Sequence, residues 1–478
     1  SISPPPEKKR KKKKERGERE ESKASIKVVN SIRQGRSMAE EMITLDTLKM
    51  AAEIVKKGSR VKNLVRIPPR LYQAHPEAYT PLFVSIGPFH YIGRYSKLIQ
   101  GSKNRFNKVK HILAMETQKQ ACMLQFMSCE KLSDPCPEFT ARYGRLNANY
   151  VGPNVSNPPE TLSGIDSPRI TNTDLKAPPQ MVLRACNPPD SSEIVSHADN
   201  PLQQELLERC QQFVRENLDG IWDLYCEEIE TSLEILANII LVDSCFLLGF
   251  LARGPRGIFS ALRGDLVLLE SQIPFFVLVR LSKILDKFHG EHHLGMLILE
   301  TFELCPKPLW SPHVLYKVLS PKNRKDYTHY NFNVAESLHR MNFGRDCIHL
   351  LDFIRQYHVL QITIEHTLPI KIDRWTAIHL RNATKLSASG VTIECAEFNH
   401  FHSVLNLSFS EGGLSIPPLL ISDYTETLFI NLLAHEHLSP NYRDYFTSYV
   451  FLMAQLIESE GDLQLLESFT MSLEVGGM

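Results

Sequence analysis

The sequence lacks the short motifs that mark the commonest catalytic and cofactor-binding sites. It contains no G-x-x-x-x-G-K-[ST] phosphate loop, no G-x-G-x-x-G, no G-x-S-x-G nucleophile turn and no H-E-x-x-H zinc helix. Its ten cysteines include no C-x-x-C pair, so we expect them to be buried, reduced thiols. From these absences we predict no catalytic residue, no cofactor and no metal site.

Targeting and membrane signals are also scarce. No secretory signal sequence opens the chain, which favours a reducing compartment. The longest apolar stretch, residues 235–252, is almost long enough to span a membrane but carries Asn238, Asp243 and Ser244 near its middle. An Asp at the centre of a spanning helix costs about 2.5–3.5 kcal/mol on insertion scales. We therefore predict a buried core helix, and an intracellular, soluble chain as given.

Charge is distributed unevenly, although the formal net charge is zero. Residues 1–24 hold ten Lys and Arg against five Glu, which leaves 44 basic and 49 acidic residues in the rest. This balance argues against nucleic-acid binding by the folded part. Residues 1–38 are predicted to be a disordered basic tail. Its uninterrupted basic run is an ordinary solvated segment, a nuclear-import signal or a signal for an anionic surface; it comprises Lys8, Lys9, Arg10, Lys11, Lys12, Lys13 and Lys14.

The sequence that follows the tail divides into three parts. Residues 39–134 combine helical spacing at 40–56 and 103–127 with a proline-rich stretch at 66–90, which predicts extended strands or loops laid against a core. Residues 135–200 are predicted to be an insert or linker, because 151–190 alone contain eight of the 29 prolines. Residues 201–478 complete the domain. Apolar residues there follow one helix face from Leu206 to Tyr225, which predicts a long helix.

Strand patterns are confined to one region. Residues 405–417 alternate around Glu411-Gly412-Gly413, which is typical of a β-hairpin, and residues 391–397 supply a third strand. Helical spacing resumes over 425–433 and 446–466. The predicted fold class is therefore α+β, predominantly α-helical, with a small antiparallel β-meander near residues 391–420.

Polar residues interrupt an apolar run at Asp265, Glu270, Gln272 and Pro274. Pro274 must break or kink a helix, and the neighbouring polar side chains can then bond to the freed backbone groups or pair with Arg280. We interpret this motif as structural. The alternative is an unrecognised enzyme that uses Asp265 and Glu270 as acid and base, since buried carboxylates have perturbed pKa values.

Two histidine clusters are weak metal-site candidates. His289, Glu291, His292 and His293 lie within five residues and fit no closed tetrahedral site, so a solvated polar turn is expected. His435 and His437 lie two residues apart, which places them on different faces of a helix. Because Pro440 follows, this second cluster predicts the end of a helix.

The order of the motifs resembles the plant family known as domain of unknown function 247, over residues 62–475 without the insert. Four blocks carry the resemblance: Ile67-Pro68 with Val84-Ser-Ile-Gly-Pro-Phe-His90, Asp243-Ser-Cys-Phe-Leu-Leu248, Asp265 to Phe275, and Thr425 to Glu436 followed by Thr447-Ser-Tyr449. Ser271 stands where the family usually has Asn, and His435 and His437 also depart from its pattern. Members usually continue to an apolar C-terminal membrane anchor, so the end at Met478 is expected to be a truncation.

The resemblance implies a plant protein without an established enzymatic activity. Some grass members of the family are associated with self-incompatibility recognition, so the resemblance also implies a signalling or interaction role. It also implies membrane association for full-length members. Together with the missing catalytic motifs, it favours a noncatalytic interaction or recognition protein whose partners are other proteins.

Overall fold

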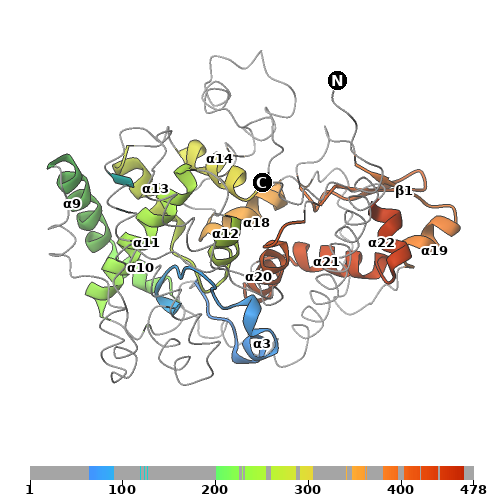
Figure 1. Ribbon diagram of the computed structural model, residues 1–478, viewed down its shortest axis with the longest axis horizontal. Coiled ribbons are helices and arrows are strands. Elements are labelled where there is room, and N and C mark those ends of the chain that lie inside the picture. The colour runs from blue at the N-terminus through green and yellow to red at the C-terminus, as the bar shows by residue number, and fades with distance from the viewer. Residues whose placement is uncertain are drawn as a thin grey trace, which may run out of the picture.

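The computed structural model describes residues 64–90, 201–225, 232–253, 260–286, 291–304, 347–360, 381–396, 403–419, 421–439 and 442–467, with the single residues 119, 123, 126, 127, 229, 338, 341 and 362. Figure 1 shows these residues as a row of packed helices that ends in a small sheet. The predicted basic tail, the helix expected at 40–56 and the proline-rich insert lie outside the described residues.

The first half of this row is built around helix α11 (Leu233–Arg253), which packs against α9 (Pro201–Glu216), α13 (Phe275–Ile284) and α14 (Glu291–Thr301). Helix α11 is the predicted core helix. By length and mean hydropathy, 2.2 over Leu233–Ala252, it could cross a membrane, but 89% of its apolar window is buried inside the protein. Its apolar surface therefore covers the protein core, as expected for a core helix.

The long helix predicted from Leu206 to Tyr225 is interrupted. Helix α9 ends at Glu216 and α10 (Leu218–Asp223) follows after Asn217, whose φ is −108°. The Asn217 side chain donates a hydrogen bond of 2.8 Å to the Phe213 carbonyl, the kind of local bond with which Asn competes with helix continuation. Apolar spacing continued across this break because both helices turn the same face to the core.

The apolar run around Pro274 is divided into two helices. Helix α12 (Ser260–Leu266) ends eight residues before Pro274, and α13 begins directly after it, with Pro274 at its N-cap. The sequence predicted that Pro274 would either break or kink a helix, and the structure shows a break. Residues 267–274 form a buried loop, and the next N–H, that of Phe275, donates to the Ile348 carbonyl at 2.8 Å.

The N-terminal strap, residues 64–90, crosses this core with little regular structure. It contains only the short helix α3 (Pro69–Ala74) and the 3-10 turns η1 (Pro76–Ala78) and η2 (Pro88–His90), and each of these begins with proline. A proline is tolerated in the first turn because its missing N–H would have no partner in the helix. Of the strands or loops predicted here, the structure has loops over most of the strap, and helix α3 was not expected.

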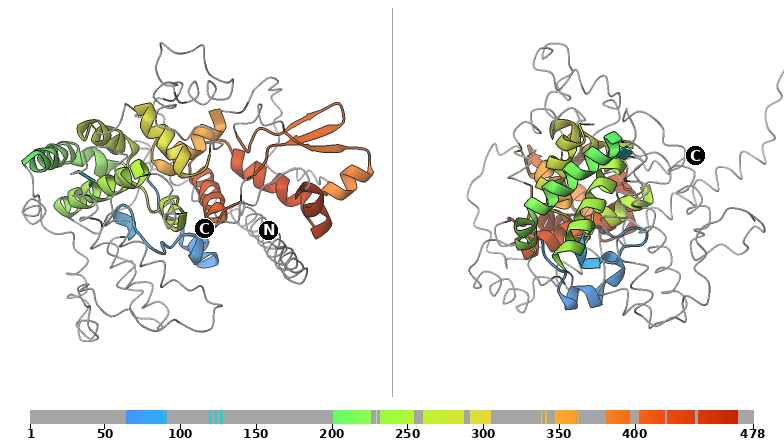
Figure 2. Two further views of the ribbon diagram at one scale, coloured as in Figure 1. Left: turned by 45° about the horizontal axis from the view of Figure 1, so that its top comes forward. Right: turned by 90° about the vertical axis from the view of Figure 1, so that its left-hand side faces the viewer.

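The second half of the row joins α18 (Leu350–Leu360), α20 (Thr425–Leu438) and α21 (Tyr445–Leu456). Helix α20 packs against both α18 and α21. Beyond them, α19 (Ala383–Ala388) packs against α22 (Glu460–Glu467) and against the sheet, as the left view of Figure 2 shows. Helix α20 ends before Pro440, where the sequence predicted a helix end.

The sheet contains the three expected strands but not in the expected order. Strands β2 (Ser408–Ser410) and β3 (Gly413–Ile416) form the predicted hairpin, whose turn residues Glu411 and Gly412 have φ of 51° and 81°. Positive φ at both turn positions suits a tight hairpin. Strand β1 (Thr392–Cys395), however, pairs parallel to β3, giving the order β1-β3-β2. The predicted antiparallel meander is wrong: the sheet is mixed.

Candidate functional site

The described part of the chain buries many charged side chains, and most of them gather in two clusters. The first, which we call the carboxylate clamp, consists of Asp243, Asp265 and Glu270, whose oxygens bind the strap. The second, the α18–α20 cluster, joins those two helices through side chains that include Asp352, Arg355, His435 and Glu436. Both are built from residues that lie far apart in the sequence.

Asp265, near the end of α12, binds three consecutive backbone N–H groups of the strap. Leu82 donates to Oδ1 at 2.7 Å, and Phe83 and Val84 donate to Oδ2 at 2.6 and 2.8 Å. Burial raises the pKa of this carboxyl to about 7, against the opposing effect of the three N–H donors. The carboxylate of Asp265 therefore provides hydrogen-bond acceptors for the strap backbone, as the carbonyls of a neighbouring strand do in a sheet.

Asp243, in the middle of α11, holds the strap a few residues further on. Its Oδ2 accepts the Gly87 N–H at 2.7 Å, and its Oδ1 accepts from Lys119 Nζ at 2.7 Å. The same ammonium group donates to the Ser85 carbonyl. Lys119 and Asp243 are both buried, so this ion pair satisfies two charges that would otherwise be costly in the core. Asp243, one of the polar residues that interrupt the apolar stretch of α11, thus faces the strap.

Glu270, in the loop between α12 and α13, holds the beginning of the strap. Its Oε1 accepts the Ile67 N–H at 2.8 Å, while Oε2 lies 3.8 Å from Nε2 of His90 at the end of the strap. Arg280, the basic partner considered from the sequence, is instead exposed on α13. The clamp therefore contacts the strap near both of its ends and in its middle.

Gln272 stabilises the loop itself. Its Nε2 donates to the carbonyls of Leu266 and Leu268 at 2.9 and 2.8 Å, and its Oε1 accepts the Leu351 N–H of α18 at 3.2 Å. Its own backbone carbonyl faces Gly87, whose φ is +74°. The structure thus brings Asp265, Glu270 and Gln272 together around the strap, with Pro274 directly behind them.

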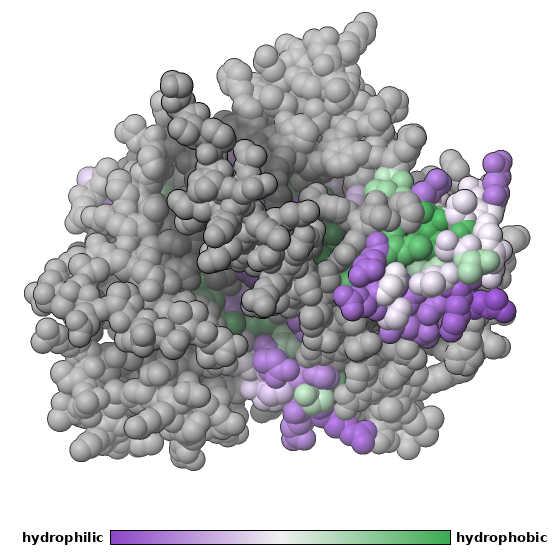
Figure 3. Space-filling view, turned by 45° about the vertical axis from the view of Figure 1, so that its right-hand side comes forward, coloured by the Kyte–Doolittle hydropathy of each residue, from purple (hydrophilic) through white to green (hydrophobic). Residues whose placement is uncertain are grey.

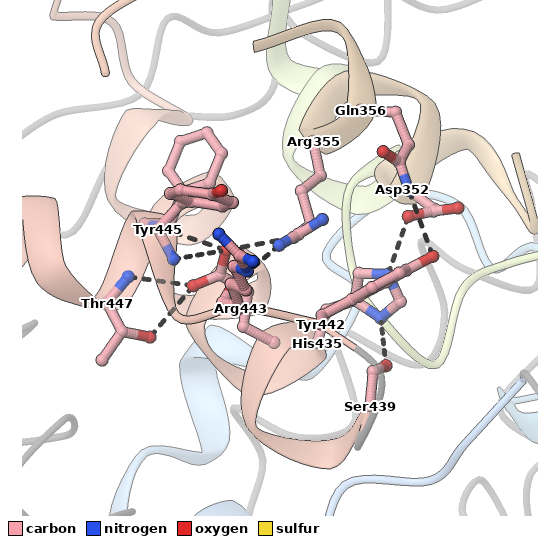
Figure 4. Close-up of polar contacts among 11 residues, drawn as sticks. Asp352, Arg355, Gln356, His435, Ser439, Tyr442, Arg443, Tyr445 and Thr447 are labelled. Carbon is pink, nitrogen blue, oxygen red and sulfur yellow. Dashed lines mark hydrogen bonds and ion pairs between the residues drawn. The ribbon is translucent and has the colours of Figure 1, made fainter. Parts of the chain in front are cut away.

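In the α18–α20 cluster, Glu436 accepts five hydrogen bonds (Figure 4). Arg355 Nε and the N–H groups of Tyr445 and Phe446 donate to Oε1 at 3.0, 3.1 and 3.2 Å. Thr447 donates to Oε2 through both its N–H and its hydroxyl, at 3.0 and 3.1 Å. Burial raises the pKa of Glu436, and Arg355 and the donors of Thr447 and Phe446 oppose that rise.

The Arg355 guanidinium connects α18 to the segment after α20. Besides its pair with Glu436, it donates through Nη2 to the Arg443 carbonyl at 2.8 Å and lies 4.2 Å from the ring centroid of Tyr442. These contacts use the planar, many-donor geometry that a lysine could not reproduce. The buried pair of Arg355 and Glu436 therefore joins α18 to α20, and further hydrogen bonds of Glu436 connect it to the start of α21.

On the other side of the cluster, Asp352, His435 and Ser439 form a chain of polar contacts. Asp352 Oδ1 lies 3.2 Å from His435 Nε2, and His435 Nδ1 lies 3.4 Å from the Ser439 hydroxyl. The order resembles a hydrolase triad, but Ser439 is the C-cap of α20. A helix C-terminus presents carbonyl oxygens and negative potential, which would oppose the oxyanion of acyl transfer. The arrangement favours a structural contact.

Sequence reasoning located the clamp residues but missed the α18–α20 cluster. The segment 435–437 was interpreted only as a helix end, whereas His435 and Glu436 are buried. The spacing offered a signal, because Glu436 follows the buried Leu432 and Leu433 by four and three residues and so lies on their face. Its partners on α18 lie about eighty residues away, and no local pattern indicates that pairing.

Metal ligation finds no support in the described part of the chain, where no three His, Cys, Asp or Glu side chains are grouped around a common point. Of the cluster at 289–293, residue 289 lies outside the described residues, and His293 is buried in α14. Of the described cysteines, Cys210, Cys245 and Cys347 are buried and Cys395 is partly exposed.

Comparison with known proteins gives a consistent assignment. The sequence profile of a plant family of unknown function, domain of unknown function 247, matches residues 64–150 and 192–471. The unmatched residues 151–191 fall within the predicted proline-rich insert. A UPF0481 protein of Arabidopsis thaliana is 25% identical over 315 residues, which cover 59% of this chain and 61% of that protein.

No solved structure matches. The chain spans less than two thirds of the length of its Arabidopsis relative, so the relative carries no functional assignment to this chain. The family match includes the strap, all three clamp carboxylates and both helices of the α18–α20 cluster. The chain belongs to the plant family of unknown function called domain of unknown function 247.

Proposed function

We propose that this protein is a noncatalytic interaction or recognition protein whose partners are other proteins. The observation that carries the proposal is the occupation of its buried carboxylates. Asp265 accepts three strap N–H groups and Glu436 accepts five donors, so their oxygens are engaged in holding the fold. A general base must instead reach a substrate proton directly or through one water.

One observation favours the alternative, an enzyme that uses Asp265 and Glu270. Burial raises the pKa of Asp265 to about 7, a value suited to acid–base work at neutral pH. The geometry weighs against it, because Asp265 and Glu270 are only 3% and 1% exposed and contact the strap. A substrate would have to displace the strap before it could reach either carboxylate.

A structural role for Glu270 predicts a loss of stability on its removal. Glu270→Ala leaves the buried Ile67 N–H without its acceptor, which should lower the free energy of unfolding by about 1–3 kcal/mol. Denaturant unfolding followed by circular dichroism measures the change. Glu205→Ala, at an exposed position of α9, is the matched control and should change stability by less than about 0.5 kcal/mol. Equal stability of the two variants would contradict the structural role.

The interaction role requires a direct partner. Figure 3 shows apolar side chains on the face formed by the sheet and its neighbouring helices, beside hydrophilic ones. Phe409 of β2 is 65% exposed, so it is the first side chain of the sheet to replace by mutation. Partners captured from plant tissue should bind the purified chain in titration calorimetry, and Phe409→Ser tests whether this face contributes. A turnover that Asp265→Asn abolishes without shifting the melting curve would instead establish the enzyme.

Any targeting of the chain is proposed to come from Lys8 to Lys14. We expect replacement of all seven basic residues by Gln to redistribute a fluorescently tagged chain, because the run attracts either an import receptor or an anionic membrane surface. Attraction to a membrane surface contributes about 1 kcal/mol per basic residue and weakens with salt, whereas nuclear import needs no membrane contact. Identical distributions of the two tagged chains would remove the proposed role of the tail.

A further inference from the structure

Helix α18 begins with an unusual cap. His349 occupies the N-cap position, where Ser, Thr, Asp or Asn is usual, and its Nδ1 accepts the N–H of Asp352 three residues later at 3.1 Å. Asp352 Oδ2 in turn accepts the Ile348 N–H at 2.9 Å. The two side chains satisfy two backbone donors at the helix start, in the manner of a capping box whose cap is an imidazole.

This cap works only when the imidazole is neutral. Because the Asp352 N–H is a donor, Nδ1 must be the unprotonated nitrogen, and the proton of the neutral ring sits on Nε2. A second proton would place an N–H on Nδ1 directly against the Asp352 N–H. It would also add a positive charge at the positive end of the helix. Protonation therefore disrupts the cap for two reasons, one geometric and one electrostatic.

The surroundings of His349 compensate a charge only in part. The residue is completely buried, and among the described residues its Nε2 has no hydrogen-bond partner. The groups that face it are Asp352 from α18 and His435 from α20, whose ring lies 4.7 Å away; Tyr442 and Arg355 with its partner Glu436 lie further along the cluster. One carboxylate thus faces two imidazoles.

The cap and the helix junction share that carboxylate. Asp352 uses Oδ2 within the capping box and Oδ1 to contact His435 Nε2 on α20 at 3.2 Å. Loss of the cap would release the first turn of α18, including Asp352, and with it the contact to α20. A proton at His349 is thereby coupled to the packing of two helices that lie far apart in sequence.

We propose that His349, Asp352 and His435 form an acid-sensitive junction between α18 and α20, which is intact at neutral pH and opens as the solution becomes acidic. The electrostatics agree in direction: burial and His435 lower the pKa of His349 to about 3, against the opposing effect of Asp352. A histidine with a lowered folded pKa contributes stability that is present above about pH 6.5 and is lost as pH falls toward the folded value.

The test uses the full chain and His349→Asn, because an Asn side-chain oxygen can cap a helix and does not titrate. Between pH 7.5 and pH 5.5 the unfolding equilibrium constant of the wild type should rise about tenfold more than that of the variant. Hydrogen exchange should show the origin. In the wild type, acid should increase the opening of the Leu351, Asp352 and Phe353 amides more than that of the α11 amides. In the variant, acid should not increase the opening of these three amides relative to α11.

His358→Gln is the matched control, since His358 is a second buried histidine of α18 whose pKa burial lowers to about 4 but which does not cap the helix. This variant should lose part of the global pH dependence yet retain acid-induced opening of the first turn. Should His349→Asn fold poorly at pH 7.5, His349→Ser supplies another non-titrating cap. Acid-induced opening of the first turn that persists in the folded His349 variant would overturn the proposal.

Discussion

Gly87→Ala is expected to lower the free energy of unfolding by about 3–4 kcal/mol, through two effects at one position. A Cβ built on Gly87 lies 2.4 Å from the backbone oxygen of Gln272, closer than real contacts permit, and that oxygen cannot swing aside like a side chain. The φ of +74° adds strain for any residue with a Cβ. The strap must therefore move away from the loop that follows α12.

The movement would disturb more than one contact. The Gly87 N–H donates to Asp243, and the Gln272 carbonyl accepts the Tyr225 hydroxyl at 3.3 Å. Gly390→Ala is the matched control, because Gly390 has a φ of +92° but no atom within 4 Å of its added Cβ. Chemical denaturation should show a loss of about 1–2 kcal/mol for the control, from backbone strain alone. Equal losses for both variants would show that the close approach is unimportant.

The strap illustrates what the sequence could and could not predict. Its prolines correctly excluded long helices, and the polar residues Asp243, Asp265 and Glu270 were recognisable as exceptions within apolar runs. Which backbone groups they bind could not be predicted, because these contacts join positions more than 150 residues apart. Periodicity reports which face of an element is buried, and it carries no information about what lies against that face.

The predictions for the sheet and for the helix at α9 were wrong for related reasons. Alternation located all three strands, yet strand order depends on long-range pairing, and β1 pairs with β3 instead of extending a meander. The break at Asn217 was invisible to apolar spacing, because it depends on a bond between one polar side chain and a carbonyl of the preceding turn. Local polar chemistry and distant pairing therefore account for these errors. The positions of α11 and α20 were predicted correctly, whereas the helical spacing over 446–466 belongs to two helices, α21 and α22.

Glu436→Gln should be the most damaging single change in the α18–α20 cluster. The amide removes the partner charge of Arg355, which would remain as a buried, unpaired guanidinium, and its NH2 group would face donors of Thr447 or Tyr445. Breaking a buried ion pair from one side typically costs about 3–5 kcal/mol. We expect a loss of that size in the free energy of unfolding at pH 7, measured by denaturant titration.

Glu303→Gln is the control that isolates burial, since Glu303 pairs with Arg263 at 2.9 Å, nearly the 3.0 Å of Glu436 and Arg355, while its side chain is 27% exposed. Solvent reaches the Glu303 carboxylate and screens the pair, although Arg263 itself is buried beside the ring of Tyr424, so we expect a smaller loss than for Glu436→Gln. The same chemical change at the same distance thus compares a buried carboxylate with an accessible one. If Glu436→Gln were no more harmful than Glu303→Gln, the ion pair would not be what fixes α18 to α20, and the contact between Asp352 and His435 would have to be assigned that role.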